Sequence, residues 1–273
     1  MKCVIAIALL SFAIPLYAAA EKKPIKVCYE NVELKPFILG TKTIPAKPGY
    51  IVELVKLAVE ASGAKAVFYR KPWKRCIHNL KHGEVDAIFA AIRTPEREKW
   101  ASFPDSAHAE QYLLKVTYPI FVNRKSNLKW DGQQFHGVKY GVGAPLGYIA
   151  RQHLMEMNVY PKGVHHLNLE RGMRMVALGR LDGYVINQTT GEQLVQNLGL
   201  DEQVTTLSTP FMYEFLHLAF SKPFFQKSKL CAEQVWHQLA LTRQTYGEKL
   251  LNSYKNGSEF TLTLPKSSYQ KGC

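Results

Sequence analysis

The chain has 273 residues, with 35 lysines and arginines against 22 aspartates and glutamates, and a net charge of +13. The basic residues form no dense run and accompany no nucleic-acid motif, so the charge indicates a solvated basic surface rather than a polyanion-binding protein. After the first twenty residues no segment approaches 18 uninterrupted apolar residues, which argues against a membrane-spanning helix.

Residues 1–20 have the features of a signal peptide. Lys2 supplies the positive charge, residues 4–16 are apolar, and Ala18–Ala20 form a small-residue cleavage site. The apolar stretch is too short for a spanning helix of about 20 residues. Cleavage after Ala20 removes 20 of the 273 residues and leaves 253, enough for two lobes with their own cores. We expect an exported, periplasmic protein.

Apolar periodicity and turn residues predict alternating strands and helices. In the first half we expect a strand at 25–29, a helix at 50–62, a strand at 66–70, a helix–glycine–strand unit at 75–89 and a strand at 112–122 that Pro119 breaks. In the second half we expect a turn at 130–132, a strand at 139–142, a helix at 148–157, a second helix–glycine–strand unit at 171–185, a strand at 211–220 and helices within 224–254.

The two helix–glycine–strand units are similar to each other. RCIHNLKHGEVDAIF at 75–89 and RGMRMVALGRLDGYV at 171–185 share an arginine, a glycine eight residues later and a following aspartate. Gly83 and Gly179 lie where a residue just after a helix adopts the left-handed conformation. Two such units suggest two similar α/β lobes, with ligands bound beyond the carboxyl ends of the strands. A chance match of a common helix-stop pattern is the alternative.

The C-terminal helical segment is larger than a second lobe needs, which suggests that the chain returns to the first lobe. We therefore predict an α/β protein in which residues 21–117 and 212–273 form lobe 1 and residues 118–211 form lobe 2. Two crossings, near 116–124 and 206–214, would act as hinges around a cleft.

Four cysteines remain after the signal peptide, and an even number in an oxidising compartment suggests two disulfides with three possible connectivities. Cys28 and Cys76 belong to elements of the same lobe. Cys231 and Cys273 both lie near the C-terminus, where a disulfide would hold the tail. The favoured pairing is therefore Cys28–Cys76 and Cys231–Cys273.

Several motifs resemble, in order and spacing, the extracellular solute-binding protein family 3, the periplasmic amino-acid-type binding proteins of ABC transporters. They are Pro48-Gly49 with Glu53, Pro72-Trp73, Gly83-x-x-Asp86, Thr94-Pro95-Glu96-Arg97 followed by Phe103-Pro104, Gly179-x-x-Asp182, and Phe220-Ser221-Lys222. The resemblance spans the mature chain. It implies the two-lobe periplasmic-binding-protein fold of type II, closing on a small solute.

The resemblance also implies a binding site. The arginine of the Thr94-x-x-Arg97 loop would hold a ligand carboxylate, since a guanidinium makes two parallel charge-assisted bonds to it. Arg93 is a second candidate for that role. Trp73 matches the family's aromatic wall, and Phe37 is the expected opposing wall.

One position departs from the family. Amino-acid binders place an aspartate that receives the ligand ammonium where this chain has Asn187, and an amide cannot neutralise a charge. Glu30 or Glu53 would then replace that charge, or the ligand lacks an ammonium. Gly147 precedes a helix whose N-terminus can receive an anion.

The leading interpretation is therefore a monomeric periplasmic protein that captures a small carboxylate-bearing solute, an amino acid or related organic acid, for an ABC permease in the inner membrane. We expect no catalysis, cofactor or nucleic-acid partner. His78 and His82 lack the third ligand of a metal site. The alternative is an enzyme on the same fold, a periplasmic dehydratase acting on a prephenate-like acid, for which Glu30, Glu53 or a histidine would be the general acid or base.

Overall fold

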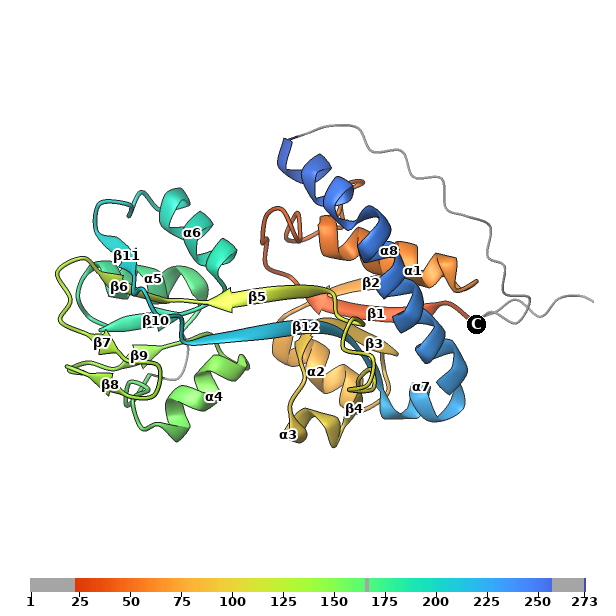
Figure 1. Cartoon of the computed structure of the whole chain (residues 1–273), viewed down its shortest axis with the longest axis horizontal. Helices are drawn as coiled ribbons and strands as arrows, with labels where there is room; N and C mark the ends of the chain where they lie inside the picture. The colour runs from red at the N-terminus through yellow and green to blue at the C-terminus, as the bar shows by residue number, and fades with distance from the viewer. Residues whose placement is uncertain (1–22, 165–166, 257–272) are drawn as a thin grey trace, which may run out of the picture.

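The computed structural model describes residues 23–164, 167–256 and 273. It shows two α/β lobes side by side, each built on its own sheet (Figure 1). The predicted signal peptide lies outside the described residues. In the part of the chain that is described, no helix combines the length and the apolar character that a membrane crossing requires.

The first lobe is built on a six-stranded sheet of order β2–β1–β3–β12–β4, in which β5 also pairs with β12. β1 is parallel to β2 and β3, whereas β12 is antiparallel to β3, β4 and β5. The strands are β1 (Ile25–Glu30), β2 (Ala66–Lys71), β3 (Ala87–Ile92), β4 (Ala101–Ser102), β5 (Leu114–Tyr118) and β12 (Met212–Ser221).

Helices from both ends of the chain cover this sheet. They are α1 (Tyr50–Ala61), α2 (Trp73–Lys81), α3 (Pro95–Glu98), α7 (Lys222–Lys227) and α8 (Lys229–Asn256). α8 lies beside α1 (Figure 1), and residues of both, such as Leu54 and Leu239, are fully buried in one apolar core. This burial stabilises the attachment of the C-terminal helices to the first sheet.

The second lobe is built on a four-stranded sheet of order β11–β6–β10–β9. Its strands are β6 (Ile120–Asn123), β9 (Val142–Gly143), β10 (Gly183–Val185) and β11 (Val204–Thr206); β7 (Lys129–Trp130) and β8 (Phe135–His136) pair separately. Its helices are α4 (Ile149–Glu156), α5 (Leu169–Ala177) and α6 (Gln188–Asn197). A Cβ atom on Gly191 of α6 would lie 2.1 Å from the Phe121 ring. Glycine therefore allows α6 to lie directly on the sheet.

The two similar units have the expected structure in both lobes. α2 is followed by Gly83 (φ 69°) and β3, and α5 by Gly179 (φ 64°) and β10. The aspartates of the two units accept backbone hydrogen bonds: the Asp86 carboxylate from Lys26 N, and the Asp182 carboxylate from the N–H groups of residues 139–141. Each aspartate thus ties its unit to a neighbouring segment of the same lobe.

The chain passes between the two sheets twice, from Tyr118 to Ile120 and from Thr206 to Met212. β5 and β12 run side by side between the lobes in Figure 1. Pro119 separates β5 from β6, which is consistent with proline's inability to donate a ladder hydrogen bond. The exact residues at which each predicted lobe begins and ends stay a prediction.

One expectation for the second lobe needs correction. The strand predicted at 139–142 is reduced to Val142–Gly143, because the N–H groups of residues 139–141 bind Asp182 instead of a strand. After the second unit the chain enters helix α6, which begins at Gln188 with Asn187 as its N-cap. Both disulfides, Cys28–Cys76 and Cys231–Cys273, pair the cysteines as the sequence predicts.

Candidate functional site

A cavity of about 70 Å³ lies between the lobes. The first lobe contributes Glu30, Trp73, Ala90 and Arg97 to its lining, and the second contributes Tyr148, Asn187 and Thr190. Its remaining walls are mainly apolar, as in most small-molecule sites.

The cavity is lined where strands end. Glu30 closes β1, Ala90 and Ile92 lie in the last half of β3, and Asn187 follows β10. Carboxyl ends of parallel strands are the usual ligand sites of open α/β sheets. Ala90 adopts φ 59° beside the irregular pairing of β3 with β12. Left-handed backbone is costly for a residue other than glycine, and such strain clusters at binding sites.

Arg97 is the cationic group of the cavity. It lies in α3, whose N-cap Thr94 accepts a hydrogen bond from Arg97 N, and its side chain is only 4% exposed. The guanidinium donates to Ile92 O at 2.9 Å and to Gly147 O at 3.2 Å. Desolvation lowers its pKa to about 10. Among the described residues no carboxylate forms an ion pair with it, so a buried positive charge faces the cavity without a counter-ion.

Glu30 is the acidic group of the cavity. Its carboxylate accepts a hydrogen bond of 2.7 Å from the Tyr148 hydroxyl, which belongs to the other lobe. Desolvation raises the pKa of Glu30, and the bond from Tyr148 only partly offsets this. Within the part of the chain that is described, no cation lies within ion-pair distance of this carboxyl group. The cavity therefore holds one basic and one acidic group that are not paired with each other.

Asn187 lines the cavity but is already engaged. Its Oδ1 accepts a hydrogen bond of 2.9 Å from Thr190 N, which makes it the N-cap of α6. Asparagine is among the preferred residues at this position because its oxygen satisfies a free N–H of the first turn. The same oxygen is thus less available to a ligand ammonium than the sequence suggests.

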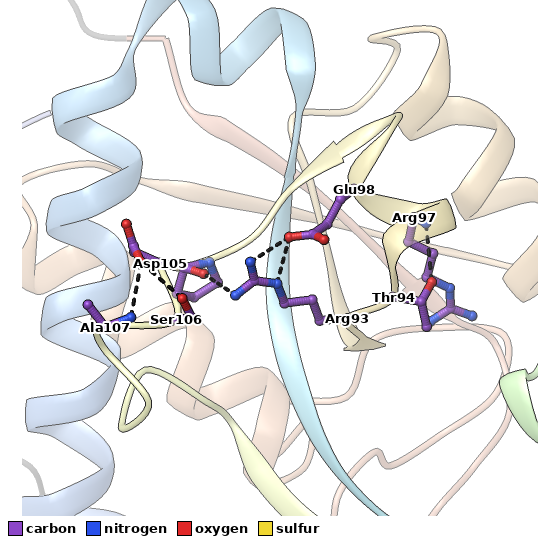
Figure 2. A network of polar contacts seen from close by, with 8 residues as sticks. Arg93, Thr94, Arg97, Glu98, Asp105, Ser106 and Ala107 are labelled. Carbon is purple, nitrogen blue, oxygen red and sulfur yellow. Dashed lines mark hydrogen bonds and ion pairs between the residues drawn. The ribbon is translucent and has the colours of Figure 1, made fainter.

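Arg93 and Thr94 do not line the cavity. Arg93 forms an ion pair with Glu98 at 2.5 Å and donates to Pro104 O at 3.0 Å. Figure 2 shows the guanidinium groups of Arg93 and Arg97 directed to different sides of the 94–98 segment. Arg93 is therefore paired with a carboxylate, that of Glu98, whereas Arg97 has no carboxylate partner among the described residues.

Three other predicted positions also lie outside the lining. Phe37 is buried against Tyr50 in the apolar core beside the first sheet, with ring centroids 6.2 Å apart. Glu53 accepts a hydrogen bond from Tyr254 of α8. Gly147 contributes its carbonyl to Arg97, and a Cβ there would lie 3.3 Å from Trp73. Gly147 (φ 85°) thus allows the second lobe to approach α2 closely.

Two tyrosines of the site were not predicted. Tyr148 follows Gly147 directly, so its place at a helix start beside a candidate residue was a usable indication. Tyr118 is 4% exposed, ends β5 at the first passage between the lobes and lines the cavity. Its pKa is raised by burial. No local pattern marks this residue, because its role depends on the crossing itself.

No metal site is found among the described residues, where no three His, Cys, Asp or Glu side chains gather. His78 and His82 stack on each other with ring centroids 4.1 Å apart. His82 Nδ1 also lies 2.8 Å from the carbonyl of His78. Ring stacking and the contact with the backbone therefore explain why these two histidines lie together.

Comparison with known proteins places these features in context. The family described as bacterial extracellular solute-binding proteins, family 3, matches residues 26–135. No curated protein sequence matches the chain. A histidine kinase sensor domain with similarity to periplasmic binding proteins superposes with a TM-score of 0.68 and 18% identity, covering 87% of this chain and 97% of that one.

Two further solved structures have the same fold. The arginine-, lysine-, histidine-binding protein of the thermophilic bacterium Geobacillus stearothermophilus gives a TM-score of 0.65 at 18% identity, covering 87% of this chain and 96% of its own. An ancestral amino acid-binding protein, a precursor of cyclohexadienyl dehydratase, gives 0.61 at 18% identity and covers 85% and 94%. The predicted α/β, two-lobe periplasmic-binding-protein fold of type II is confirmed.

Proposed function

We propose that this chain, which belongs to the bacterial extracellular solute-binding proteins, family 3, captures a small carboxylate-bearing solute in the cavity between its lobes. The solute is an amino acid or a related organic acid. The protein acts in the periplasm after removal of its signal peptide and presents the solute, as a monomer, to an ABC permease in the inner membrane.

The observation that carries this proposal is the unpaired charge of Arg97. A buried ion without a counter-ion is costly, and a cavity that keeps one requires a ligand of opposite charge. The guanidinium donates hydrogen bonds to Ile92 O and Gly147 O and has further N–H groups that a ligand can accept from. A planar fork of this kind binds a carboxylate through parallel charge-assisted bonds.

Glu30 is the group that receives a solute ammonium in this proposal. Asn187 carries no charge and its oxygen caps α6, whereas Glu30 lines the same cavity and has no cationic partner among the described residues. An α-amino or other amine of the solute would pair with Glu30 while its carboxylate pairs with Arg97. The cavity would then hold a zwitterion without an unbalanced charge.

Arg97 variants test the proposal with the solute identified by mass spectrometry after extraction from exported protein. We expect Arg97→Ala to weaken binding by about 2–5 kcal/mol, because the solute carboxylate is left buried and unpaired. Arg97→Lys should restore only part of this, since an ammonium cannot reproduce the fork. Calorimetry measures each affinity.

Arg93→Ala is the matched control, because Arg93 lies four residues away and is paired with Glu98 outside the cavity. Its affinity should stay close to that of the unaltered protein. Equal losses for the two alanine variants, or full binding by Arg97→Ala, would rule out the carboxylate role of Arg97.

A second candidate function is supported by the environment of Glu30. A carboxyl group with a raised pKa, hydrogen-bonded to Tyr148 in a cavity with an arginine, has the properties of a general acid. A dehydratase acting on a prephenate-like acid would use such a group. Incubation with prephenate, followed by ultraviolet detection of phenylpyruvate, distinguishes the two, and Glu30→Gln should abolish any turnover that is observed.

A further inference from the structure

A second, larger space lies beside the cavity. It has a volume of about 650 Å³ and shares Arg97, Tyr148 and Ile149 with the cavity lining. We call it the vestibule; α2 and α3 of the first lobe and α4 of the second contribute to its walls. Its charged lining residues are Lys74, Lys81, Glu96, Arg97, Arg151 and Glu156.

Positive charge predominates in the vestibule, because four of these residues are cationic and two are acidic. The two carboxylates bind neutral groups: Glu96 accepts from the Trp100 indole at 3.1 Å, and Glu156 from the Gln152 amide at 2.9 Å. Among the described residues neither carboxylate forms an ion pair. The excess positive charge is therefore not neutralised by the walls.

The cations of the vestibule come from both lobes. Lys74 of α2 is exposed and has no ion-pair partner in the described part of the chain. Arg151 of α4 lies over the Tyr160 ring at 4.8 Å and forms no ion pair with a described residue. An anion between α2 and α4 would therefore be attracted from both sides of the cleft.

We propose that the vestibule is a second anion subsite and that the solute carries two anionic groups. One carboxylate binds Arg97 and the other lies near Lys74 and Arg151, which makes the solute a dicarboxylic acid or an acidic amino acid. This inference rests on the proposed function, because it assigns the first carboxylate to Arg97. An anionic group in the vestibule would also favour the closed arrangement, since its cations belong to different lobes.

Two matched pairs of probes test the proposal by calorimetry at constant ionic strength: L-glutamate against L-glutamine, and glutarate against butyrate. Within each pair the first probe has the additional carboxylate. We expect the dianionic probe of at least one pair to bind about fivefold or more tightly than its partner. Lys74→Met and Arg151→Met should each reduce that ratio, while Lys227→Met, which removes an exposed cation on α7, should leave it unchanged.

The outcomes separate the inference from the proposed function. If the probes bind but the ratio is close to one in both pairs, the second subsite is overturned and the role of Arg97 stands. If the ratio is large but unaffected by the Lys74 and Arg151 variants, the second carboxylate binds elsewhere and the vestibule assignment fails. If none of the four probes binds, the inference of a dicarboxylic acid or acidic amino acid is overturned, while the role of Arg97 is decided separately by its variants with the extracted solute.

Discussion

Two residues of opposite charge line the cavity, the buried Arg97 and the partly buried Glu30. Desolvation shifts their pKa values in opposite directions, downward for the arginine and upward for the glutamate. In both cases burial favours the neutral form. A protein stabilised only by its own contacts would gain nothing from such a pair, which is why we interpret both residues as ligand contacts.

The raised pKa of Glu30 predicts a pH-dependent stability. Between the ordinary pKa of glutamate and the raised value, the folded state binds more protons at this site than the unfolded state. The free energy of unfolding contributed by Glu30 therefore falls as the pH rises through that interval. Glu30→Gln should remove this fall, as measured by urea unfolding of ligand-free protein between pH 4 and pH 8.

Glu53→Gln provides the comparison for that experiment, because Glu53 is bonded to Tyr254 and lies outside the cavity. Its stability profile should keep the pH dependence of the unaltered protein. A Glu30→Gln profile with an undiminished fall would show that Glu30 is not the group responsible.

At the scale of elements, the two helix–glycine–strand units are held by their aspartates. Among the described residues the Asp182 carboxylate accepts three backbone hydrogen bonds, from residues 139–141, whereas the Asp86 carboxylate accepts one, from Lys26 N at 2.8 Å. The units are thus similar in sequence, but their aspartates accept different numbers of backbone hydrogen bonds. The segment before β9 depends on Asp182 in place of strand pairing.

Asp182→Ala should therefore be more destabilising than Asp86→Ala. Removing the carboxylate leaves three N–H groups without their acceptor, and we expect a loss of about 1–3 kcal/mol in the free energy of unfolding. Urea unfolding of the two variants gives the comparison. Equal losses would mean that the number of backbone bonds to each aspartate does not determine its contribution.

At the scale of the whole molecule, two hydrogen bonds join the lobes across the cavity. Tyr148 donates to Glu30 and Arg97 donates to the Gly147 carbonyl. The chain connects the lobes through two passages, at Tyr118–Ile120 and Thr206–Met212, and a rotation about them would open the cavity. These bonds therefore stabilise the closed arrangement against an open one.

Tyr148→Phe should shift the ligand-free protein toward the open arrangement, because it removes only the hydroxyl that bonds to Glu30. Small-angle X-ray scattering should give a larger radius of gyration than for the unaltered protein, and saturating solute should reduce it again. Tyr69→Phe, on the exposed face of β2, is the control. Identical scattering curves for the two variants would show that the Tyr148 hydroxyl does not contribute to closure.

The sequence by itself determined the features that depend on local pattern. The glycines at 83 and 179, the aspartates that follow them and the cysteine pairs were predictable, and the Thr94-to-Arg97 loop marked the cationic group of the cavity. Helix ends and capping residues act within a few positions of the chain, so their effect can be inferred from neighbouring residues.

Only the tertiary structure decided which side chains meet. The sequence leaves Arg93 as a second candidate beside Arg97, but Glu98 and Pro104 O bind Arg93, and Arg97 alone of the two lines the cavity. Glu30 and Glu53 are alternatives in the sequence for the residue that pairs with a ligand ammonium. In the structure Glu30 lines the cavity and accepts a hydrogen bond from Tyr148, 118 residues away, whereas Glu53 lies outside the lining. Side-chain direction depends on partners from distant segments, and those partners come together only when the two lobes pack against each other.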